Sequence, residues 1–388
     1  MLSFVQLPGA SSLLKLPTEL VGTIASFLSS DDLFNFRRAC RKLKKDASHV
    51  FTQRHFRTKQ FYPSYDGLSA LKDISKSDLA KYCKTLILGP QVPFLPHPDL
   101  IKVNVGYDRS KAQCLGPYKL YYDQKISMVD GCQDISMLKT ALTNLKKCEK
   151  LEVRSYSESG YSLSCGNFND ALPSHGEATF KRITKVFTMP YDDDTNVVDS
   201  LFDTVLHAAL LAKALVRSIV FDSPYDQFDP YDPPLLRQWA SLLENLTQED
   251  KGANDYSLAR LEHLELCVRH HDLVRWTEIE GNLVRLFDFT PKIEKLGLNF
   301  KRFLRTSMPL TYIGDSWNLG TVKTLDLSNL FADKADMIGL IKNLLAAKIN
   351  HVQFRNVQIG GKSRLAKGTS HDTPGTSGLK NIFIHSFL

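Results

Sequence analysis

The chain has 388 residues, of which 43% are apolar and 23% charged, and its formal net charge is +7. This composition is typical of a globular protein and excludes a chain that is disordered throughout. The most apolar run, 201–221, contains four charged or imidazole side chains, whereas a membrane-spanning helix needs about 20 nearly uninterrupted apolar residues. The first residues lack the basic segment of a secretory signal. We therefore expect no membrane partner and a cytoplasmic or nuclear location.

Seven cysteines are scattered along the chain, and no two are spaced as Cys-x-x-Cys. This argues against both a disulfide framework and a zinc ribbon, so we expect reduced thiols. The positive charge is concentrated, because residues 31–60 hold nine Lys or Arg against three Asp. That stretch therefore accounts for six of the seven net charges.

Two amphipathic helices are predicted near the N-terminus. Pro17 suits the first turn of a helix, and apolar residues follow at helical spacing, namely Leu20, Ile24, Phe27 and Leu28. The sequence Ser-Ser-Asp-Asp at 29–32 ends this helix and caps the next. The second helix repeats apolar residues at i, i+3, i+7 and i+10, namely Leu33, Phe36, Cys40 and Leu43. A third helical stretch continues to Phe56, so three short helices are predicted.

From about residue 61, short segments of the form Leu-x-x-Leu-x-Leu recur. They lie at 83–88, 148–153, 183–188, 216–221, 261–266, 293–298, 322–327, 349–354 and 379–384. Six of the eight steps between them span 27 to 35 residues, as expected when each strand is followed by a helix and stacks on its neighbour. Helical patterns fill gaps at 135–145, 201–216, 235–246, 282–289 and 335–345. The pattern resembles leucine-rich repeats, without the Asn or Cys that the family carries at the ninth position.

The N-terminal helices carry more apolar surface than they can bury against one another. About forty residues are close to the size below which a chain usually needs a disulfide, a metal or a partner to stabilise a core. Not all of the large apolar side chains can point inward in so small a unit, namely Phe27, Leu28, Leu33, Phe34, Phe36 and Leu43. We expect part of this surface to contact another protein or the first repeat.

The stretch LPTELVGTIASFLSSDDLFNFRRACRKL, at 16–43, resembles an F-box. It contains Leu-Pro-x-Glu-Leu, an apolar pair closing the first helix, Asp-Leu opening the second, and Arg-x-x-Cys-Arg. One position departs from the pattern, because Leu43 stands where the family often has an aromatic residue. The segment 49–61 and a helix at 68–82 resemble the fungal F-box proteins with irregular leucine-rich repeats.

The resemblance implies a substrate-recognition subunit of a ubiquitin ligase. The F-box would bind a Skp-type adaptor and, through it, cullin and RING subunits, while the repeats bind a protein substrate. The implied adaptor-binding residues are Leu16, Pro17, Leu20, Ile24, Phe27, Leu28, Leu33, Phe36, Arg37, Cys40 and Leu43. We expect Leu20, Ile24, Phe27, Leu33 and Phe36 to form the buried centre of that interface.

The predicted fold class is α/β, with a three-helix F-box followed by an irregular leucine-rich-repeat-like solenoid of parallel strands and outer helices. The predicted divisions are a tail at 1–14, the F-box at 15–60 and the repeat domain at 61–388, which includes a flexible basic loop at 360–378. Strand residues that alternate with the apolar ones should lie exposed on a concave face. The candidate substrate-binding residues there are Glu152, Arg154, Asp222, His263, Glu265, Asn299, Asp326, Gln353 and Arg355.

Both signs of charge occur on this predicted face. A nucleic-acid groove should be mainly basic with stacking aromatics, and a phosphopeptide pocket should cluster arginines. The mixed face therefore favours an unmodified protein segment and no nucleic acid, although any one of these residues could simply be solvated.

No sequence signature of catalysis is complete. Gly-Gly-Lys-Ser at 360–363 imitates a phosphate-binding loop, but Asn356 stands where its first Gly is needed. Gly-Asp-Ser at 314–316 has no later Asp-x-x-His, and His270 and His271 are adjacent, so they cannot face one metal together. We expect no catalytic residue, cofactor or metal. Two alternatives remain, an adaptor-binding scaffold outside a cullin ligase and a repeat protein that senses a small molecule.

Overall fold

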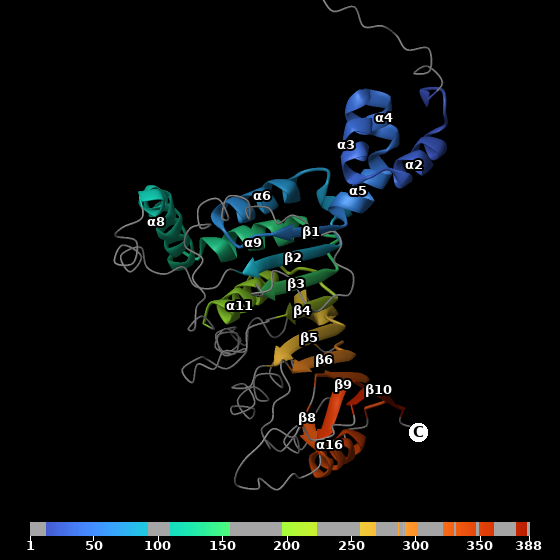
Figure 1. Cartoon of the computed structure of the whole chain (residues 1–388), viewed down its shortest axis with the longest axis vertical. Helices are drawn as coiled ribbons and strands as arrows, with labels where there is room; N and C mark the ends of the chain where they lie inside the picture. The colour runs from blue at the N-terminus through green and yellow to red at the C-terminus, as the bar shows by residue number, and fades with distance from the viewer. Residues whose placement is uncertain are drawn as a thin grey trace, which may run out of the picture.

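Figure 1 shows the computed structural model of the chain. The structure describes residues 13–91, 109–155, 196–222, 257–268, 286, 290, 292–300, 321–329, 331–346, 349–360 and 378–385. Four short helices lie at one end of a long sheet, and further helices flank that sheet.

The N-terminal helices are α2 (Thr18–Phe27), α3 (Ser30–Ala39), α4 (Arg41–Asp46) and α5 (Ser48–Phe56). We predicted three helices, but the second is broken at Cys40, whose backbone is extended. The Cys40 thiol caps α4 by accepting the backbone N–H of Leu43 at 3.5 Å. Ser29 caps α3 as predicted, because its hydroxyl accepts the N–H of Asp32 at 3.1 Å and donates to the Asp32 carboxylate at 2.7 Å.

The sheet contains ten described strands. They are β1 (Thr58–Phe61), β2 (Thr85–Gln91), β3 (Lys150–Ser155), β4 (Ser218–Asp222), β5 (His263–Val268), β6 (Lys295–Phe300), β7 (Thr324–Ser328), β8 (Phe331–Asp333), β9 (His351–Gly360) and β10 (Gly378–His385). Their order is β1-β2-β3-β4-β5-β6-β7-β9-β10, and β8 pairs with β9. All pairs are parallel except that of β9 with β10. The predicted α/β architecture with parallel strands is thus confirmed, apart from this last strand.

The strand predictions hold at eight of the nine positions. The remaining segment, 183–188, lies outside the described residues. The strands before and after it, β3 and β4, pair directly with each other. β1 and β8 were not predicted. Because β1 begins at Thr58, the predicted boundary between residues 60 and 61 falls inside a strand of the sheet.

Most of the described helices flank the sheet. They are α6 (Tyr65–Lys76), α8 (Arg109–Asp130), α9 (Gln133–Asn144), α11 (Asn196–Leu211) and α16 (Lys334–Ala346), with short 3-10 turns η1 (Ala80–Tyr82) and η2 (Ser257–Arg260). Three of the predicted helices are confirmed by α9, α11 and α16. The predicted helix at 235–246, most of the one at 282–289, and residues 361–377 of the predicted loop lie outside the described residues. In the part that the structure describes, no helix is both long enough and apolar enough to span a membrane.

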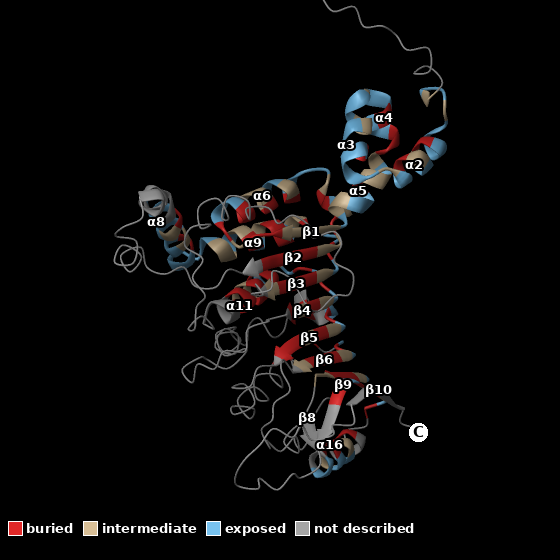
Figure 2. Ribbon diagram, in the orientation of Figure 1, coloured by how far each residue is buried: buried red, intermediate tan, exposed pale blue. Residues whose placement is uncertain are grey.

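Two rows of apolar side chains cross the sheet in register. The first row is Leu86, Leu151, Ile219, Leu264, Leu296, Leu325 and Val352. The second row is Leu88, Val153, Phe221, Leu266, Leu298, Leu327 and Phe354. Because strand side chains alternate with a period of two, both rows lie on one face, where they form a continuous core with residues of α9, α11 and α16. Figure 2 shows this buried band along the strands.

A backbone ladder joins the starts of successive strands. The carbonyl of Lys84 accepts the N–H groups of both Glu149 and Lys150, at 2.8 and 3.0 Å. The carbonyl of Glu149 in turn accepts those of Arg217 and Ser218, at 2.8 and 3.0 Å. The same arrangement recurs at Glu262, so backbone hydrogen bonds align the starts of neighbouring strands.

Candidate functional site

Helix α2 has apolar residues on two sides. Val21 and Ala25 point inward and are fully buried. Leu20 and Phe27 point outward, with exposed fractions of 50% and 85%. These two residues are seven positions apart and therefore share a side of the helix, with the half-buried Ile24 between them. We call Leu20, Ile24 and Phe27 the α2 surface.

Two of the predicted adaptor-binding residues are core residues instead. Leu33 is fully buried with Ala25 and Ala47, and Leu43 is only 5% exposed. Neither side chain is available to a partner in this conformation, because a bundle this small needs both to fill its interior. Leu28 and Phe36 are half-buried and pack against the same core. From the sequence we assigned Leu20 and Ile24 to the apolar side of the helix. We did not identify the inward pair of Val21 and Ala25, although these two residues also have i, i+4 spacing.

Basic side chains hold the α2 surface in place. Arg54 of α5 donates to the carbonyls of Leu28 and Ser26, at 2.5 and 2.8 Å, at the end of α2. Lys42 donates to the carbonyl of Leu16 at 3.2 Å and to that of Leu14. Part of the concentrated positive charge is therefore structural.

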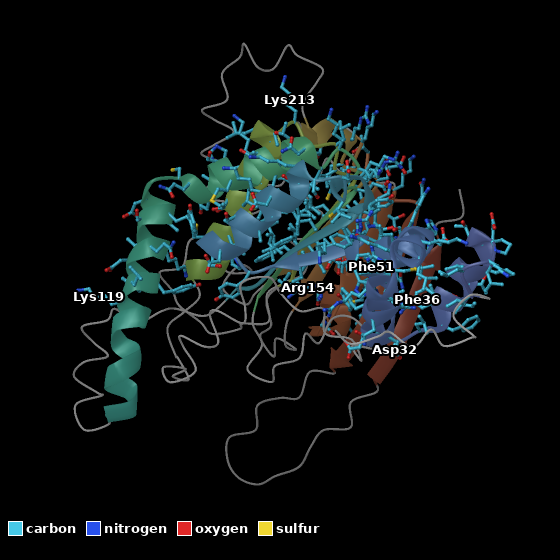
Figure 3. The ribbon with its side chains drawn as sticks, turned by 90° about the horizontal axis from the view of Figure 1, so that it is seen from above. Asp32, Phe36, Phe51, Lys119, Arg154 and Lys213 are labelled. Atoms are coloured by element: carbon cyan, nitrogen blue, oxygen red, sulfur yellow. The ribbon has the colours of Figure 1, made fainter. Side chains whose placement is uncertain are left out.

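An aromatic cluster lies where α3 meets α5. Phe34 packs edge-on against Phe51, with 5.4 Å between ring centroids, and at a tilt against His55, with 5.1 Å between centroids. The guanidinium of Arg37 stacks on the ring of Phe51 at 3.4 Å. Burial lowers the pKa of Arg37 and, together with the charges of Arg54 and Lys59, that of His55. Figure 3 labels Phe36 and Phe51 in this region. Phe51 and His55 were not among the predicted site residues, although their i, i+4 spacing places them on one side of a helix.

The remaining predicted adaptor-binding residues lie at the edges of the bundle. Pro17 is exposed, and Leu16 and Cys40 are half-buried. Five exposed cations follow along the end of α3 and along α4, namely Arg38, Arg41, Lys42, Lys44 and Lys45. Figure 2 shows that the outer sides of these helices are exposed.

A second candidate surface lies on the face of the sheet opposite the apolar rows. We call it the polar face, defined by Lys150, Glu152, Arg154, His263, Glu265, Lys295, Asp326 and Arg355. The strand register places Glu152, Val220, Glu265, Gly297, Asp326 and Gln353 side by side in one row. In Figure 3, Arg154 lies on the other side of the sheet from Lys213, at the end of α11. The predicted substrate-binding residues with described side chains thus share one face, and the side chain of Asp222 lies outside the description.

Two of the carboxylates on the polar face are buried, although we predicted them to be exposed. The Glu152 carboxylate forms an ion pair with the Lys150 Nζ at 2.6 Å and accepts a hydrogen bond from the Arg154 Nε at 3.0 Å. The Asp326 carboxylate accepts a hydrogen bond from the Arg355 Nε at 2.9 Å, and the Lys295 Nζ lies 4.0 Å from this carboxylate. A buried carboxylate needs such neutralisation, because an unpaired charge in the interior is costly. Asn299 is half-buried and accepts a hydrogen bond from Asn329 at 2.7 Å.

Glu265 lies between these two ion-paired groups. Its side chain passes over Gly297, where a Cβ atom would lie 3.0 Å from the Glu265 Cγ. The Oε2 of Glu265 is 3.9 Å from the Nε2 of His263. Burial raises the pKa of Glu265. Burial and the nearby lysines lower the pKa of His263 to about 4, so this imidazole is neutral at physiological pH.

Potential metal ligands and thiols can be located in the part of the chain that the structure describes. No group of three His, Cys, Asp or Glu side chains there lies close enough to hold a metal ion. Cys40, Cys83, Cys132, Cys148 and Cys267 form no disulfide among the described residues. Asn356 lies within β9, whereas residues 270, 271 and 314–316 lie outside the described residues.

Comparison with known protein families matches residues 13–45 to the F-box domain. No curated protein matches the chain. The matched segment contains α2, α3 and all but the last residue of α4, and therefore all three residues of the α2 surface. The chain thus contains an F-box domain at residues 13–45, the type of domain that binds Skp-type adaptors of SCF-type ubiquitin ligases.

Proposed function

We propose that this chain is the substrate-recognition subunit of an SCF-type ubiquitin ligase. Its F-box would bind the adaptor, and through it cullin and RING subunits, while the sheet binds a protein target. The chain would act in the cytoplasm or nucleus and would have no catalytic residue. Its sheet domain would be a leucine-rich-repeat-like solenoid. The observation that carries it is the α2 surface, which leaves Leu20 and Phe27 exposed on an F-box whose own core is already filled.

The α2 surface suits a helix-in-groove interface. Its apolar residues lie along one side of a ten-residue helix, the arrangement with which amphipathic helices enter apolar grooves. A standard interface buries about 1,600 Å² in total, and a few large central side chains provide most of its binding energy. Phe27 is the strongest candidate for such an anchor, because it is the most exposed large apolar residue described.

Such a receptor would act by proximity rather than by chemistry. Holding a target beside a partner-borne conjugating enzyme raises the effective concentration of the target lysine. The F-box helices lie beyond the β1 end of the sheet (Figure 1), so adaptor binding at the α2 surface does not require the polar face. One chain can therefore hold both partners at once.

The test is a charge placed on the α2 surface. Leu20→Asp and Phe27→Asp should each weaken adaptor binding by on the order of 100-fold, because an aspartate would have to lose its water in an apolar groove. Both side chains are exposed, so the sheet and the F-box core should stay folded. Adaptor affinity is measured by surface plasmon resonance with the full chain, and folding by circular dichroism.

Leu120→Asp on α8 is the matched control, because Leu120 is 72% exposed and lies outside the F-box. It should bind the adaptor as the unchanged protein does. Undiminished binding by the Leu20→Asp, Phe27→Asp double variant would refute the interface. Co-purification with both adaptor and cullin separates a ligase subunit from a scaffold that binds the adaptor alone.

A further inference from the structure

Short connections lead into each of the strands β3, β4, β5 and β6. Because these strands are parallel and adjacent, their connections all lie at the edge of the sheet where the strands begin. The described parts of the connections are 145–149, 212–217, 257–262 and 292–294, and they contain six Lys or Arg against three Glu. This edge of the sheet therefore carries a net positive charge.

The three glutamates of these connections already have partners. Each forms an ion pair with a cation at the start of a neighbouring strand, namely Glu149 with Lys84, Glu262 with Arg217, and Glu294 with Lys323. The backbone ladder described above holds these residues side by side, because each carbonyl accepts an N–H from the start of the next strand. Within the described connections, no carboxylate is therefore left to neutralise a further cation.

Five cations remain, and we call them the basic edge. Lys146 and Lys147 precede β3, Lys213 precedes β4, Arg260 precedes β5 and Lys292 precedes β6. All five are exposed, and none forms an ion pair with a described residue. Figure 3 shows Lys213 pointing outward. Neighbouring strands are about 4.8 Å apart, so the basic edge spans about 14 Å across four strands.

The dipoles of the neighbouring helices do not account for the whole row. A cation just after a helix offsets the partial negative charge of the helix C-terminus, and Lys146 and Lys213 follow α9 and α11 in this way. Arg260, however, ends the 3-10 turn η2, whose four residues have little dipole to offset. Like charges at this spacing repel one another, so an anionic partner would relieve their repulsion.

We propose that the basic edge binds an extended acidic segment of a protein target. Carboxylates at alternate positions of an extended chain lie about 6.7 Å apart, so three of them span about 13 Å, close to the length of the row. The flexible stems of the lysines let each ammonium group follow a carboxylate without a strict register. The inference rests on the proposed function, because it names the kind of target that the receptor would select.

The chemistry of the basic edge favours carboxylates over phosphates. Four of its five cations are lysines, which act as point charges, whereas recognition of phosphate often uses the planar fork of arginine. Single-stranded nucleic acids are also held by aromatic side chains on which the bases stack. The described residues of the four connections include no Phe, Tyr or Trp. An acidic protein segment needs neither feature.

The basic edge lies on the side of the sheet to which the F-box is attached. Helix α5 ends at Phe56 and β1 begins at Thr58, so the F-box joins the sheet at the start of a strand. Because β1 to β7 are parallel, the basic edge is formed at the same ends of the strands. A target bound there would lie on the same side as the F-box, where action by proximity would need it.

The first experiment measures peptide binding by fluorescence anisotropy, with the full chain at low ionic strength. The probe is an eight-residue peptide with capped ends, Glu at positions 1, 3, 5 and 7, and Ser elsewhere. It should bind at least about tenfold more tightly than the same peptide with Gln in place of Glu, because each exposed ion pair contributes up to about fivefold. Added salt should reduce this difference. Equal binding of the two peptides would overturn the inference, and so would tighter binding of an oligothymidylate of the same charge.

The second experiment locates the binding surface with two triple variants. The first reverses three charges of the basic edge, namely Lys147→Glu, Lys213→Glu and Lys292→Glu. It should bind the Glu peptide at least about tenfold more weakly than the unchanged protein does.

The matched control variant reverses three exposed lysines on α8 and α16, namely Lys119→Glu, Lys334→Glu and Lys342→Glu. It has the same net charge as the first variant and should bind the Glu peptide within about twofold of the unchanged protein. Equal losses in the two variants would show that only net charge matters, and this result would overturn the inference, as would undiminished binding by the first variant. All six side chains are exposed, and thermal unfolding checks that both variants are folded.

Adaptor binding, measured on the same protein samples, separates the two proposals. If the unchanged protein fails to bind the adaptor, the proposed function is wrong, whatever the peptides do. If adaptor binding is intact and the basic-edge variant binds the Glu peptide as the unchanged protein does, only the inference about the basic edge is wrong.

Discussion

Individual residues on the polar face are controlled by how far each is buried. Glu152 and Asp326 are buried and each is neutralised by two cations, whereas Glu265 is partly buried with a neutral imidazole beside it. All three face the same way, because the strand register aligns them. Burial and pairing therefore distinguish two buried, ion-paired carboxylates from one that stays partly exposed.

His263 makes the stability of the sheet depend on pH. Its pKa is about 4 in the folded chain and about 6.5 when unfolded, so the unfolded chain binds more protons between these values. Stability from this group is therefore present above pH 6.5 and is lost as the pH falls toward 4. Burial raises the pKa of Glu265, which acts in the opposite direction by favouring a protonated folded state, and offsets part of the loss.

The prediction concerns His263→Gln, whose amide can keep the hydrogen bond to Ser218 that the imidazole makes at 3.1 Å. Between pH 7 and pH 4.5, the melting temperature of this variant should fall less than that of the unchanged protein. Differential scanning fluorimetry across this range provides the measurement. Parallel curves for the two proteins would show that His263 titrates normally in the folded state.

Single glycines govern two elements in opposite ways. Gly89 has a φ of +136° where the pairing of β2 with β3 shifts register, and a Cβ there would lie 2.1 Å from the Arg154 carbonyl oxygen. Gly22 lies inside α2, and a Cβ there would meet nothing within 4 Å. Gly89→Ala should therefore cost about 3 kcal/mol or more, whereas Gly22→Ala should stabilise α2 by about 0.5–1 kcal/mol. Urea unfolding followed by circular dichroism measures the loss of stability in Gly89→Ala. Hydrogen exchange of the α2 amides measures the gain in Gly22→Ala. A tolerated Gly89→Ala would mean that the register shift is not fixed by this contact.

The sequence predicted most strands because their signal is local. Leu, Ile or Val at alternate positions, such as Leu86 and Leu88, identifies a buried strand face without any long-range information. The direction of β10 was not predictable, because an antiparallel last strand has the same alternation as a parallel one. The break at Cys40 was hidden for a similar reason, since apolar spacing continues across it.

The candidate surfaces were only partly predictable. The F-box motif located the helices, but which apolar side chains face inward depends on how the helices pack, and Leu33 and Leu43, predicted for the adaptor interface, are buried in the bundle. Alternation correctly grouped the residues of the polar face. Their ion pairs could not be foreseen, because the partner of Asp326 depends on the register of strands 29 residues apart in the chain.

The part of the chain that the structure describes contains two separate apolar cores. The sheet core is continuous from β1 to β9, so each strand is stabilised by its neighbours. The F-box core is small, because Ala25, Leu33 and Ala47 form its buried cluster with Val21 and Leu43 also buried nearby, and it is joined to the sheet where α5 leads into β1. A unit with so little buried apolar surface should be the less stable of the two.

We therefore expect the F-box to open before the sheet, and the adaptor to reverse that order. Amide protons of α2 to α4 should exchange faster than those of β3 to β7 in the free chain, and Leu33→Ala, which removes about 2–5 kcal/mol of core packing, should abolish the F-box protection alone. Adaptor at 100 times its dissociation constant should stabilise the F-box by about 2.7 kcal/mol, because it binds only the folded form. Hydrogen exchange followed by mass spectrometry resolves the two regions in one sample. Simultaneous loss of protection in both regions would show that the sheet and the F-box unfold as one cooperative unit.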